Sequence, residues 1–359
     1  MSRRVYVIAE AGVNHNGSIA AALDLVDAAA DAGADAVKFQ TFRTEKVVSR
    51  LAPKAEYQKK TTGAEESQYE MIKKLELDES AHVALIERCR SKEIAFLSTP
   101  FDPESLDMLA NRFELPLIKI PSGEITNAPF LLEIARTGKP VIFSTGMSNL
   151  EEIEEALGVL AFGYLDSREP PSMSAFMKAF ESTEGNAMLK ERVILLHCTT
   201  EYPAPFGEIN LKAMETMRNA FGLPVGYSDH TEGIAVPIAA VALGAVVIEK
   251  HFTLDCNLPG PDHKASLEPC ELKQMVKSIR EVEVALGSSI KQPTASELKN
   301  KAVARKSLVA ARDISKGTPF SEENLAVKRP GDGINPIRYW EWLGKEAQRD
   351  YSQDEQVRD

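Results

Sequence analysis

The feature that most constrains the fold of this chain is a regular alternation of short apolar runs with amphipathic stretches. We predict a strand for each apolar run, at residues 5–9, 36–39, 95–97, 117–120, 141–143, 193–196, 225–227 and 246–248. The stretches between them predict helices near residues 19–32, 79–92, 103–112, 128–136, 149–161, 209–220, 234–243 and 270–286. Apolar strands joined by crossover helices are typical of a parallel sheet that is buried on both faces. Eight such units in about 285 residues predict an α/β fold, a (β/α)₈ TIM barrel, rather than an open sheet.

Two of the predicted helix-to-strand joints have similar sequences. Both begin with Gly-Ala, at Gly33 and at Gly244, directly before an apolar run. Glycine commonly ends a helix by adopting a left-handed backbone conformation. We therefore expect a positive φ at both glycines.

The alternating pattern stops near residue 287, which we take as the end of the barrel domain (1–287). Residues 288–303 are polar, contain Pro293 and predict a linker. Residues 304–359 show short strand-like pieces and predict a small β-rich domain. Because so short a domain buries little apolar surface by itself, we expect it to pack against the barrel or against a partner chain.

Two long segments interrupt the barrel pattern. Residues 43–77, after the second strand, are expected at the catalytic end of the barrel. Residues 162–191, before the sixth strand, are expected at the opposite end, where they would not affect turnover.

The formal net charge of −11 argues against general binding to nucleic acid or to anionic membranes. No uncharged stretch approaches the roughly 20 residues that a membrane-spanning helix needs. The four cysteines, Cys89, Cys198, Cys256 and Cys270, show no CxxC spacing, which suits reduced thiols. We therefore expect a soluble, cytoplasmic protein.

Polar or ionisable residues follow every predicted strand at the same end. They are Glu10, Lys38, Gln40, Ser98, Thr99, Lys119, Ser122, Glu124, Ser144, Thr145, His197, Thr199, Ser228, His230, Glu249 and His251. In a barrel these carboxyl-terminal strand ends form the active site. The shared position of so many functional groups indicates an enzyme.

Lys38 and Lys119 directly follow apolar strand residues, where an unpaired ammonium group is costly to bury. They predict a site for phosphate and carboxylate groups; the alternative is a buried ion pair with Glu10 or Glu124. The Ser-Gly and Ser-Thr-Gly sequences that begin at Ser122 and Ser144 offer hydroxyl and N–H groups suited to phosphate, although such turns are common.

His230 and His251 follow neighbouring strands, so their imidazoles could share one divalent first-row metal ion. The alternative is one core histidine and one that only makes a hydrogen bond. Asp262 lies in a loop that could bind sugar hydroxyls or be an ordinary turn. Among the other histidines, we interpret His197 as a core residue, His15 as a helix cap or a substrate contact, and His82 as a surface residue.

These residues lie within motifs that closely resemble the bacterial sialic acid synthase family, whose members condense phosphoenolpyruvate with an N-acetylmannosamine-like sugar. The motifs are AEAGVNHNG (9–17), GADAVKFQT (33–41), STPFD (98–102), KIPSGE (119–124), STGMS (144–148), LHCTTEYPAP (196–205), GYSDHTEGI (226–234), EKHFTLD (249–255) and PGPDHKASLEP (259–269). The segments ARKSLVA (304–310) and KRPGDGI (328–334) resemble the family's C-terminal antifreeze-like (SAF) domain.

The resemblance implies a role for each matching residue. Phosphoenolpyruvate would be bound by Lys38, Thr99, Lys119, Ser122, Ser144 and Ser228, and the sugar by Glu10, Gln40, Glu124, Tyr202 and Asp262. His230 and His251 would hold a divalent metal ion, most often Mn²⁺, with Mg²⁺ or Co²⁺ as alternatives. Arg329 would reach the N-acetyl group across a domain-swapped homodimer. Glu10, Glu124 and Asp262 are the expected catalytic residues, with Glu124 near the cationic centre that develops at C2.

The implied product is a nine-carbon 2-keto sugar acid of the N-acetylneuraminate type, formed with release of phosphate. Thr200 and Glu201 stand where several neuraminate synthases carry an asparagine-containing pair. This departure favours the alternative of an N,N'-diacetyllegionaminate synthase, which uses 2,4-diacetamido-2,4,6-trideoxymannose. Two rival hypotheses are a synthase of seven- or eight-carbon keto sugar acids on the same barrel and a non-catalytic carbohydrate- or ice-binding protein.

Overall fold

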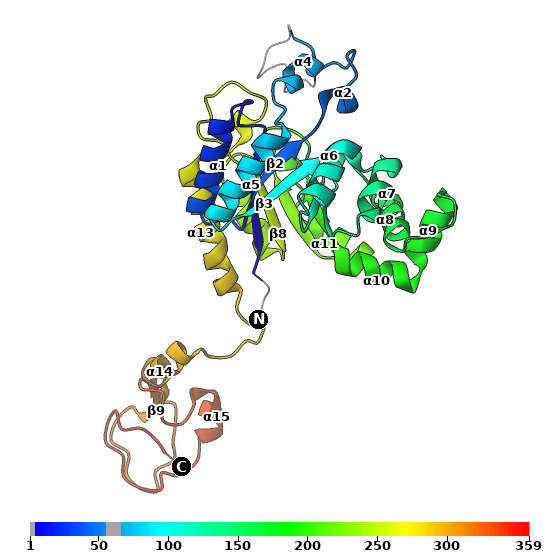
Figure 1. Ribbon diagram of the computed structural model, residues 1–359. Coiled ribbons are helices and arrows are strands. Elements are labelled where there is room, and N and C mark those ends of the chain that lie inside the picture. The colour runs from blue at the N-terminus through cyan, green and yellow to red at the C-terminus, as the bar shows by residue number, and fades with distance from the viewer. Residues whose placement is uncertain (1–3, 55–65, 359) are drawn as a thin grey trace. The chain divides into compact units, whose positions relative to one another are not determined.

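The computed structural model describes residues 4–54 and 66–358 and contains a barrel of eight parallel strands (Figure 1). The strands are β1 (Tyr6–Gly12), β2 (Ala36–Thr41), β3 (Ala95–Pro100), β4 (Ile118–Ile120), β5 (Val141–Ser144), β6 (Val193–Cys198), β7 (Val225–Asp229) and β8 (Val247–His251). Their order is β3-β2-β1-β8-β7-β6-β5-β4. β3 and β4, at the two ends of this order, contact each other, so that the barrel is nearly closed. The predicted fold class is confirmed.

Helices surround the barrel, as the sequence pattern predicts. The α-helices of this part of the chain are α1 (Ile19–Asp31), α2 (Thr44–Val47), α4 (Gln68–Lys73), α5 (Glu79–Ser91), α6 (Pro103–Asp107), α7 (Ala128–Arg136), α8 (Leu150–Tyr164), α9 (Met173–Glu181), α10 (Thr183–Arg192), α11 (Ala213–Phe221), α12 (Ala235–Ala242) and α13 (Pro269–Leu286). Single-turn elements are η1 (Met108–Arg112), η2 (Ser122–Glu124), η3 (Phe206–Glu208) and η4 (His263–Ala265). Gly33 and Gly244 have φ values of +80° and +89°, which confirms the predicted left-handed turns.

Inside the barrel, apolar residues lie closer to the amino-terminal ends of the strands than the polar residues do. Inside the barrel, Ile8, Ala36 and Val247 belong to an apolar cluster that includes residues from most of the strands. Two residues further along their strands, Glu10, Lys38 and Glu249 share the same inward face. The apolar layer therefore closes the barrel interior on the amino-terminal side of the ionisable residues at the carboxyl-terminal strand ends.

Several segments differ from the expected boundaries. Most strands extend beyond their apolar runs, and β2 pairs with β3 as far as Thr41. The 162–191 segment folds into α9 and α10, and α9 packs on α8 through Phe162 and Phe176, whose ring centroids lie 5.2 Å apart. The described part of 43–77 contains α2 and α4; residues 55–65 lie outside the described ranges.

Contacts divide the chain between Gly287 and Ser288 into two compact units. The second unit contains α14 (Ala295–Ala304), an antiparallel pair of strands, β9 (Ser307–Ala310) and β10 (Leu325–Lys328), then η5 (Pro336–Arg338) and α15 (Tyr339–Trp342). Its core includes Leu308, Phe320 and Tyr351. The polar stretch predicted as a linker thus holds a helix, which begins with a capping box formed by Thr294 and Glu297.

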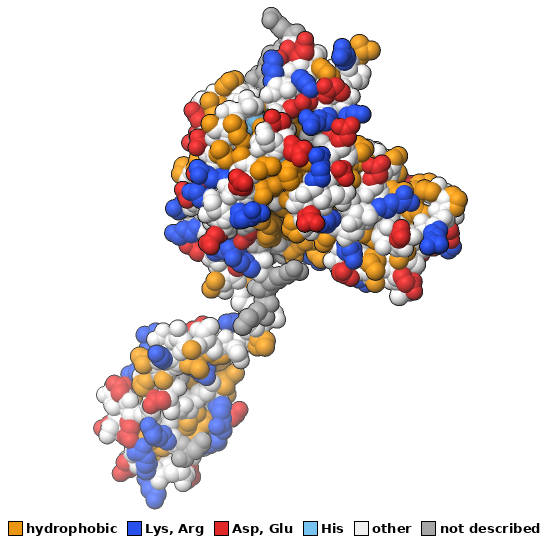
Figure 2. Space-filling model, in the orientation of Figure 1, with side chains coloured by type: hydrophobic (Ala, Val, Ile, Leu, Met, Phe, Trp, Pro, Cys, Tyr) orange, Lys and Arg blue, Asp and Glu red, His pale blue; other side chains and the backbone are white. Residues whose placement is uncertain are grey.

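None of the helices in the described ranges combines the length and the apolar character needed to cross a membrane. On the face shown in Figure 2, acidic and basic side chains are interspersed over the first unit.

Candidate active site

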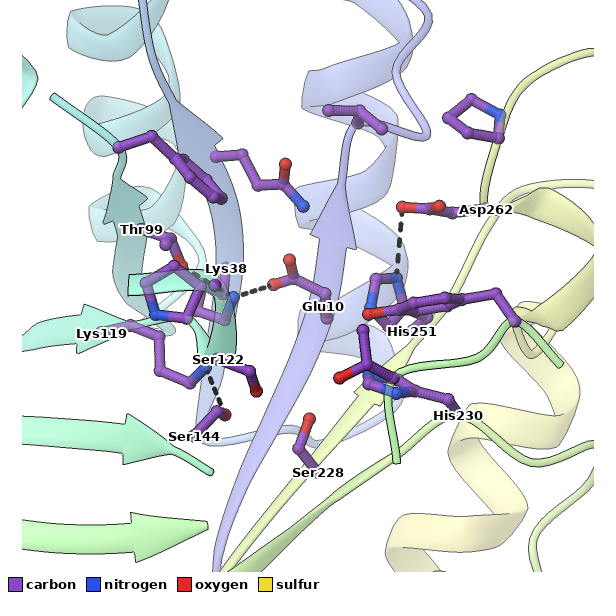
Figure 3. A pocket seen from close by; sticks show the side chains of 18 of the residues that line it. Glu10, Lys38, Thr99, Lys119, Ser122, Ser144, Ser228, His230, His251 and Asp262 are labelled. Carbon is purple, nitrogen blue, oxygen red and sulfur yellow. Dashed lines mark hydrogen bonds and ion pairs between the residues drawn. The ribbon is translucent and has the colours of Figure 1, made fainter. Parts of the chain in front are cut away.

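A cavity of about 260 Å³ opens at the carboxyl-terminal ends of the barrel strands. Most of the predicted site residues line it: Glu10, Lys38, Gln40, Thr99, Lys119, Ser122, Ser144, Tyr202, Ser228, His230, His251 and Asp262. Figure 3 shows Lys38 and Lys119 on one side of this cavity, His230 and His251 on the other, and Glu10 between them. The structure therefore brings together residues from all eight strands or from the connections that follow them.

Two lysines and two glutamates form a buried charge cluster at the base of the cavity. Lys38 Nζ lies 2.7 Å from Glu10 Oε2 and 3.5 Å from Glu249 Oε2, and Lys119 Nζ lies 3.4 Å from Glu249 Oε1. All four side chains are almost completely buried. Of the two alternative partners named for the lysines, Glu10 makes the ion pair and Glu124 does not.

The two carboxyl groups of this cluster differ in their proton affinity. Burial raises the pKa of Glu10 to about 7, although Lys38 opposes the shift. Burial acts in the same direction on Glu249, but Lys119 and Lys38 outweigh it and lower the pKa of Glu249 to about 2. When Glu10 is protonated, the two ammonium groups face a single carboxylate, which leaves net positive charge for an anionic ligand.

Hydroxyl groups surround the lysines. Lys38 Nζ donates a hydrogen bond to Thr99 Oγ1 at 3.0 Å, and Lys119 Nζ donates one to Ser144 Oγ at 2.8 Å. Gly146 N donates to Ser122 Oγ at 2.9 Å. A Cβ atom at Gly146 would come within 2.3 Å of Thr200 Oγ1 and 2.9 Å of Ser122 Oγ, so a larger residue there would displace these side chains.

His230 and His251 face each other with ring centroids 5.4 Å apart. His230 Nδ1 lies 2.6 Å from the carbonyl oxygen of Thr199, to which it must donate, so that Nε2 carries the lone pair. His251 Nδ1 is buried without a hydrogen-bond partner and lies 3.8 Å from Asp262 Oδ2. Burial lowers the pKa of both imidazoles, which keeps them in the neutral form that a metal ion requires.

This donor set fits a divalent metal ion with an incomplete protein shell. Over residues 4–54 and 66–358, no group of three or more His, Cys, Asp or Glu side chains is arranged to hold a metal ion. Two imidazoles would therefore leave most coordination positions to water or substrate, as catalytic sites require. Burial also raises the pKa of the nearby Asp262 to about 6.

Two predicted site residues do not line the cavity. Glu124, on η2, accepts a hydrogen bond from Asn127 Nδ2 at 2.6 Å. Arg329 belongs to the second unit, where its Nε donates to the carbonyl oxygen of Ala304 at 3.0 Å. Their roles remain predictions.

Three further histidines, His15, His82 and His197, do not line the cavity. The prediction that His82 lies on the surface is wrong: its ring is fully buried, and Nε2 lies 2.8 Å from Thr41 Oγ1. His197 makes a 2.7 Å hydrogen bond to the carbonyl oxygen of Ile209, as expected of a satisfied core histidine. His15 Nδ1 accepts a hydrogen bond from Gly17 N at 3.0 Å, and its buried Nε2 has no hydrogen-bond partner among the described residues; the side-chain cap of α1 comes from Ser18.

Several side chains that line the cavity carry no signal in the sequence that would mark them as site residues. Glu249 lies at a strand end, between Ile248 and Lys250, and its position along the chain does not indicate that it pairs with both Lys38 and Lys119. Thr200 lines the cavity with its buried Oγ1 lacking a partner. The segment after β2 contributes apolar side chains, including Val47 and Ile72, which no polar motif marks.

A TIM barrel with buried lysines opposite paired histidines in one cavity at its catalytic end defines a class of barrel enzymes that bind anionic substrates. Comparison with known proteins narrows this class. The model of the NeuB family matches residues 25–291, and that of the SAF domain matches residues 305–359. The chain therefore belongs to the NeuB family, as the resemblance implied, and carries a C-terminal SAF domain.

The chain is also similar over most of its length to individual members of this family. It is 54% identical to the N,N'-diacetyllegionaminic acid synthase of Campylobacter jejuni over 99% of this chain and 100% of that protein. It is 48% identical to the N,N'-diacetyllegionaminic acid synthase of Legionella pneumophila over 93% of this chain and 88% of that protein. A crystal structure of the N-acetylneuraminic acid synthetase of Leptospira borgpetersenii has a TM-score of 0.66 and 34% identity, covering 83% of this chain and 90% of that one.

These relatives are sugar acid synthases, and this chain is accordingly an enzyme. It is a phosphoenolpyruvate-dependent transferase that forms a carbon–carbon bond.

Proposed function

We propose that this enzyme condenses phosphoenolpyruvate with 2,4-diacetamido-2,4,6-trideoxymannose and water to give N,N'-diacetyllegionaminate and phosphate. The observation that carries the reaction type is the pair of buried lysines, Lys38 and Lys119, opposite the two histidines in one cavity. The observation that favours this sugar is the 54% identity, over almost the whole chain, to a protein named N,N'-diacetyllegionaminic acid synthase. The relatives thus favour 2,4-diacetamido-2,4,6-trideoxymannose over N-acetylmannosamine as the acceptor sugar.

Lys38 and Lys119, with Thr99, Ser122, Ser144 and Ser228, would bind phosphoenolpyruvate. Each lysine already holds a hydroxyl group, so the donors that a phosphate or carboxylate needs are preorganised. Ser228 Oγ donates to Glu249 Oε1 at 2.9 Å and keeps that carboxylate turned toward the lysines. Phosphoenolpyruvate would compete with Glu10 and Glu249 for the ammonium groups of Lys38 and Lys119.

Glu10, Gln40, Tyr202 and Asp262 would surround the sugar. Because its pKa is about 7, Glu10 can carry or release a proton near neutral pH. A protonated Glu10 would donate that proton to the aldehyde oxygen of the open-chain sugar while C3 of phosphoenolpyruvate attacks the aldehyde carbon. Water would then add at C2 and return one proton to Glu10. The C2–O bond to phosphate would break, the second proton of this water would leave with the phosphate, and C2 would become the ketone.

We further propose that His230 and His251 hold a divalent metal ion, with Mn²⁺ the first choice. When bound, such an ion supplies Lewis-acid polarisation of the sugar carbonyl. The carbonyl of Thr199 would fix the orientation of the His230 ring, as outer partners of metal ligands commonly do. Asp262 would orient His251 from its other side.

The test is release of inorganic phosphate from phosphoenolpyruvate with Mn²⁺, offering 2,4-diacetamido-2,4,6-trideoxymannose and N-acetylmannosamine in parallel. Faster release with the first sugar, together with a nine-carbon keto acid in the product, would support the proposal. Faster release with N-acetylmannosamine would make the enzyme a neuraminate synthase. Release only with arabinose 5-phosphate or erythrose 4-phosphate would overturn the assignment in favour of an eight- or seven-carbon product.

We also retain, as proposals, a domain-swapped homodimer in the cytoplasm and a contact of Arg329 with the N-acetyl group of the sugar bound by the partner chain. Light scattering tests the dimer directly. Arg329→Ala should raise the KM for the sugar and leave the KM for phosphoenolpyruvate unchanged, and an unchanged KM for the sugar would contradict the contact.

A further inference from the structure

The cavity has a second lining that the polar site residues do not explain. Val47, Met71, Ile72 and Leu75, which we call the apolar wall, line the same cavity as Glu10 and Lys38. All four come from the connection after β2: Val47 lies in α2, Met71 and Ile72 lie in α4, and Leu75 lies two residues beyond the end of α4. The ionisable residues, by contrast, come mainly from the strands themselves. Because the connections rise beyond the strand ends, the apolar wall lies toward the mouth and the charges toward the base.

The apolar wall is held in place by the barrel. Leu75 packs in a cluster with Val13 and Phe42, against which Ile72 and Phe101 also pack. These partners follow β1, β2 and β3, so Ile72 and Leu75 rest on residues at the ends of three neighbouring strands, whereas Val47 is partly exposed.

Hydrogen bonds also fasten the ends of the connection. Thr44 N donates to Glu76 Oε1 at 2.6 Å, which ties the start of the connection to its end. Arg43 N donates to Asp102 Oδ2 at 2.8 Å. The wall is therefore a built part of the site.

The chemistry of this wall suits a substrate group without hydrogen-bonding capacity. Its side chains are aliphatic or thioether groups. A substrate hydroxyl group that packed against them would lose its hydrogen bonds to water and gain none of comparable strength from the wall. The sugar of the proposed function carries a methyl group at C6, where N-acetylmannosamine carries a hydroxyl. Its reacting carbon, C1, must lie near the charged base of the cavity. The opposite end of the open chain, C6, then points toward the mouth.

Resting on the proposed function, we infer that the apolar wall receives the C6 methyl group of the acceptor sugar and selects against a hydroxyl group at C6. The wall is thus a specificity determinant, separate from the groups that bind phosphoenolpyruvate. A hydrophobic pocket rejects an analogue that merely adds a hydroxyl by roughly 10- to 100-fold in kcat/KM. We expect a preference of that size for the 6-deoxy sugar.

The experiment compares kcat/KM for two acceptors that differ only at C6, 2,4-diacetamido-2,4,6-trideoxymannose and 2,4-diacetamido-2,4-dideoxymannose. The variant Val47→Thr exchanges a methyl for a hydroxyl group at nearly constant volume. Ile72→Thr replaces the ethyl arm of the side chain with a hydroxyl group and is compared with Ile72→Val, which has nearly the same volume as threonine. The two threonine variants are tested singly and combined. Val83→Thr is the matched control, because Val83 lies on α5 and does not line the cavity. We expect the preference for the 6-deoxy sugar to fall about 5- to 10-fold in the double variant and to stay unchanged in the control.

Failure of this inference differs from failure of the proposed function. An enzyme that uses the 2,4-diacetamido sugar but shows the same C6 preference in the double variant and in Val83→Thr would overturn the inference alone. A wild-type enzyme without any C6 preference would do the same. If neither 2,4-diacetamido sugar reacts while N-acetylmannosamine does, the proposed function fails. The C6 test then uses N-acetylmannosamine and its 6-deoxy analogue, and faster turnover of the 6-hydroxy sugar would overturn the inference as well.

Discussion

Lys250 Nζ lies 2.6 Å from Asp229 Oδ2, and neither side chain is exposed to solvent. The two residues are register partners on β7 and β8, and their side chains lie on the outer face of the barrel. Lys250 also donates a hydrogen bond to the carbonyl oxygen of Thr231, while Tyr227 Oη donates one to Asp229 at 3.0 Å. This network therefore ties together, from outside the barrel, the two strands that end at the paired histidines.

The first prediction concerns the stability of this network. Lys250→Met should lower the free energy of unfolding by about 3–5 kcal/mol, because it leaves a buried carboxylate without its cation. The double variant Asp229→Asn, Lys250→Met should lose less than the sum of the two single losses, because the pair is coupled. Urea unfolding measures all three values. Lys277→Met, at an exposed ion pair with Glu281, is the control and should change stability by about 0.5 kcal/mol or less.

The second prediction concerns the phosphoenolpyruvate site. Lys119→Met should lower kcat/KM for phosphoenolpyruvate by about 100-fold, because a charge-assisted hydrogen bond to the anion is lost. Steady-state kinetics with varied phosphoenolpyruvate measures it, with the exposed Lys178 as the matched control in Lys178→Met. An effect confined to the KM of the sugar would contradict the assignment.

The third prediction concerns the metal ion. Treatment with a chelator should abolish phosphate release, and Mn²⁺ should restore it, because the two histidines supply ligands. His251→Ala should bind Mn²⁺ at least 10-fold more weakly in calorimetry. Full activity after chelation, in metal-free buffer, would exclude the metal from the reaction.

The fourth prediction concerns pH. Burial lowers the pKa of His15 from 6.5 to about 4, so the unfolded chain binds a proton at this residue before the folded chain does. Its contribution to stability is therefore complete above pH 6.5 and is lost as the pH falls toward 4, with a slope of at most about 1.4 kcal/mol per pH unit. His15→Asn keeps a hydrogen-bond acceptor and should flatten the curve of unfolding free energy in this window. An unchanged slope would show that His15 does not titrate there.

The fifth prediction concerns the 162–191 segment. Phe176→Ala should lower the free energy of unfolding by about 3–4 kcal/mol, because it removes a buried ring that contacts Phe162. It should leave kcat unchanged, because α9 contributes no residue to the cavity. A fall in kcat of more than about twofold at a temperature where the variant is folded would contradict the separation of this segment from the site.

The barrel could be predicted from the sequence because short apolar runs, typical of buried strands, alternate eight times with amphipathic helical stretches along the first unit. This pattern placed the strand ends too early because polar residues such as Gln40 and Thr41 look like loop residues. In the structure these residues continue the ladder with β3 while their side chains face the site or a buried partner. The burial of His82 could not be predicted, because it depends on Phe113 and Thr41 from distant segments.

Motif positions predicted most of the residues that line the cavity, because the carboxyl ends of parallel strands converge. The pairing of Glu249 with both lysines depends on distances across the barrel, which spacing along the chain does not give. The apolar wall escaped prediction for a different reason. Its residues lie in short helices within a long polar segment, where aliphatic side chains carry no chemical signature.

The register of β1 with β8 sets Glu10 beside His251. One of these residues is made near the start of the chain and the other near the end of the barrel, so they become neighbours only when the last strand docks on the first. No N-terminal fragment that lacks β8 can therefore assemble the reaction centre, even if its earlier strands pair correctly. Turnover is in this sense a reporter of complete barrel closure. Recovery of activity during refolding should therefore follow the slowest step that brings β8 against β1.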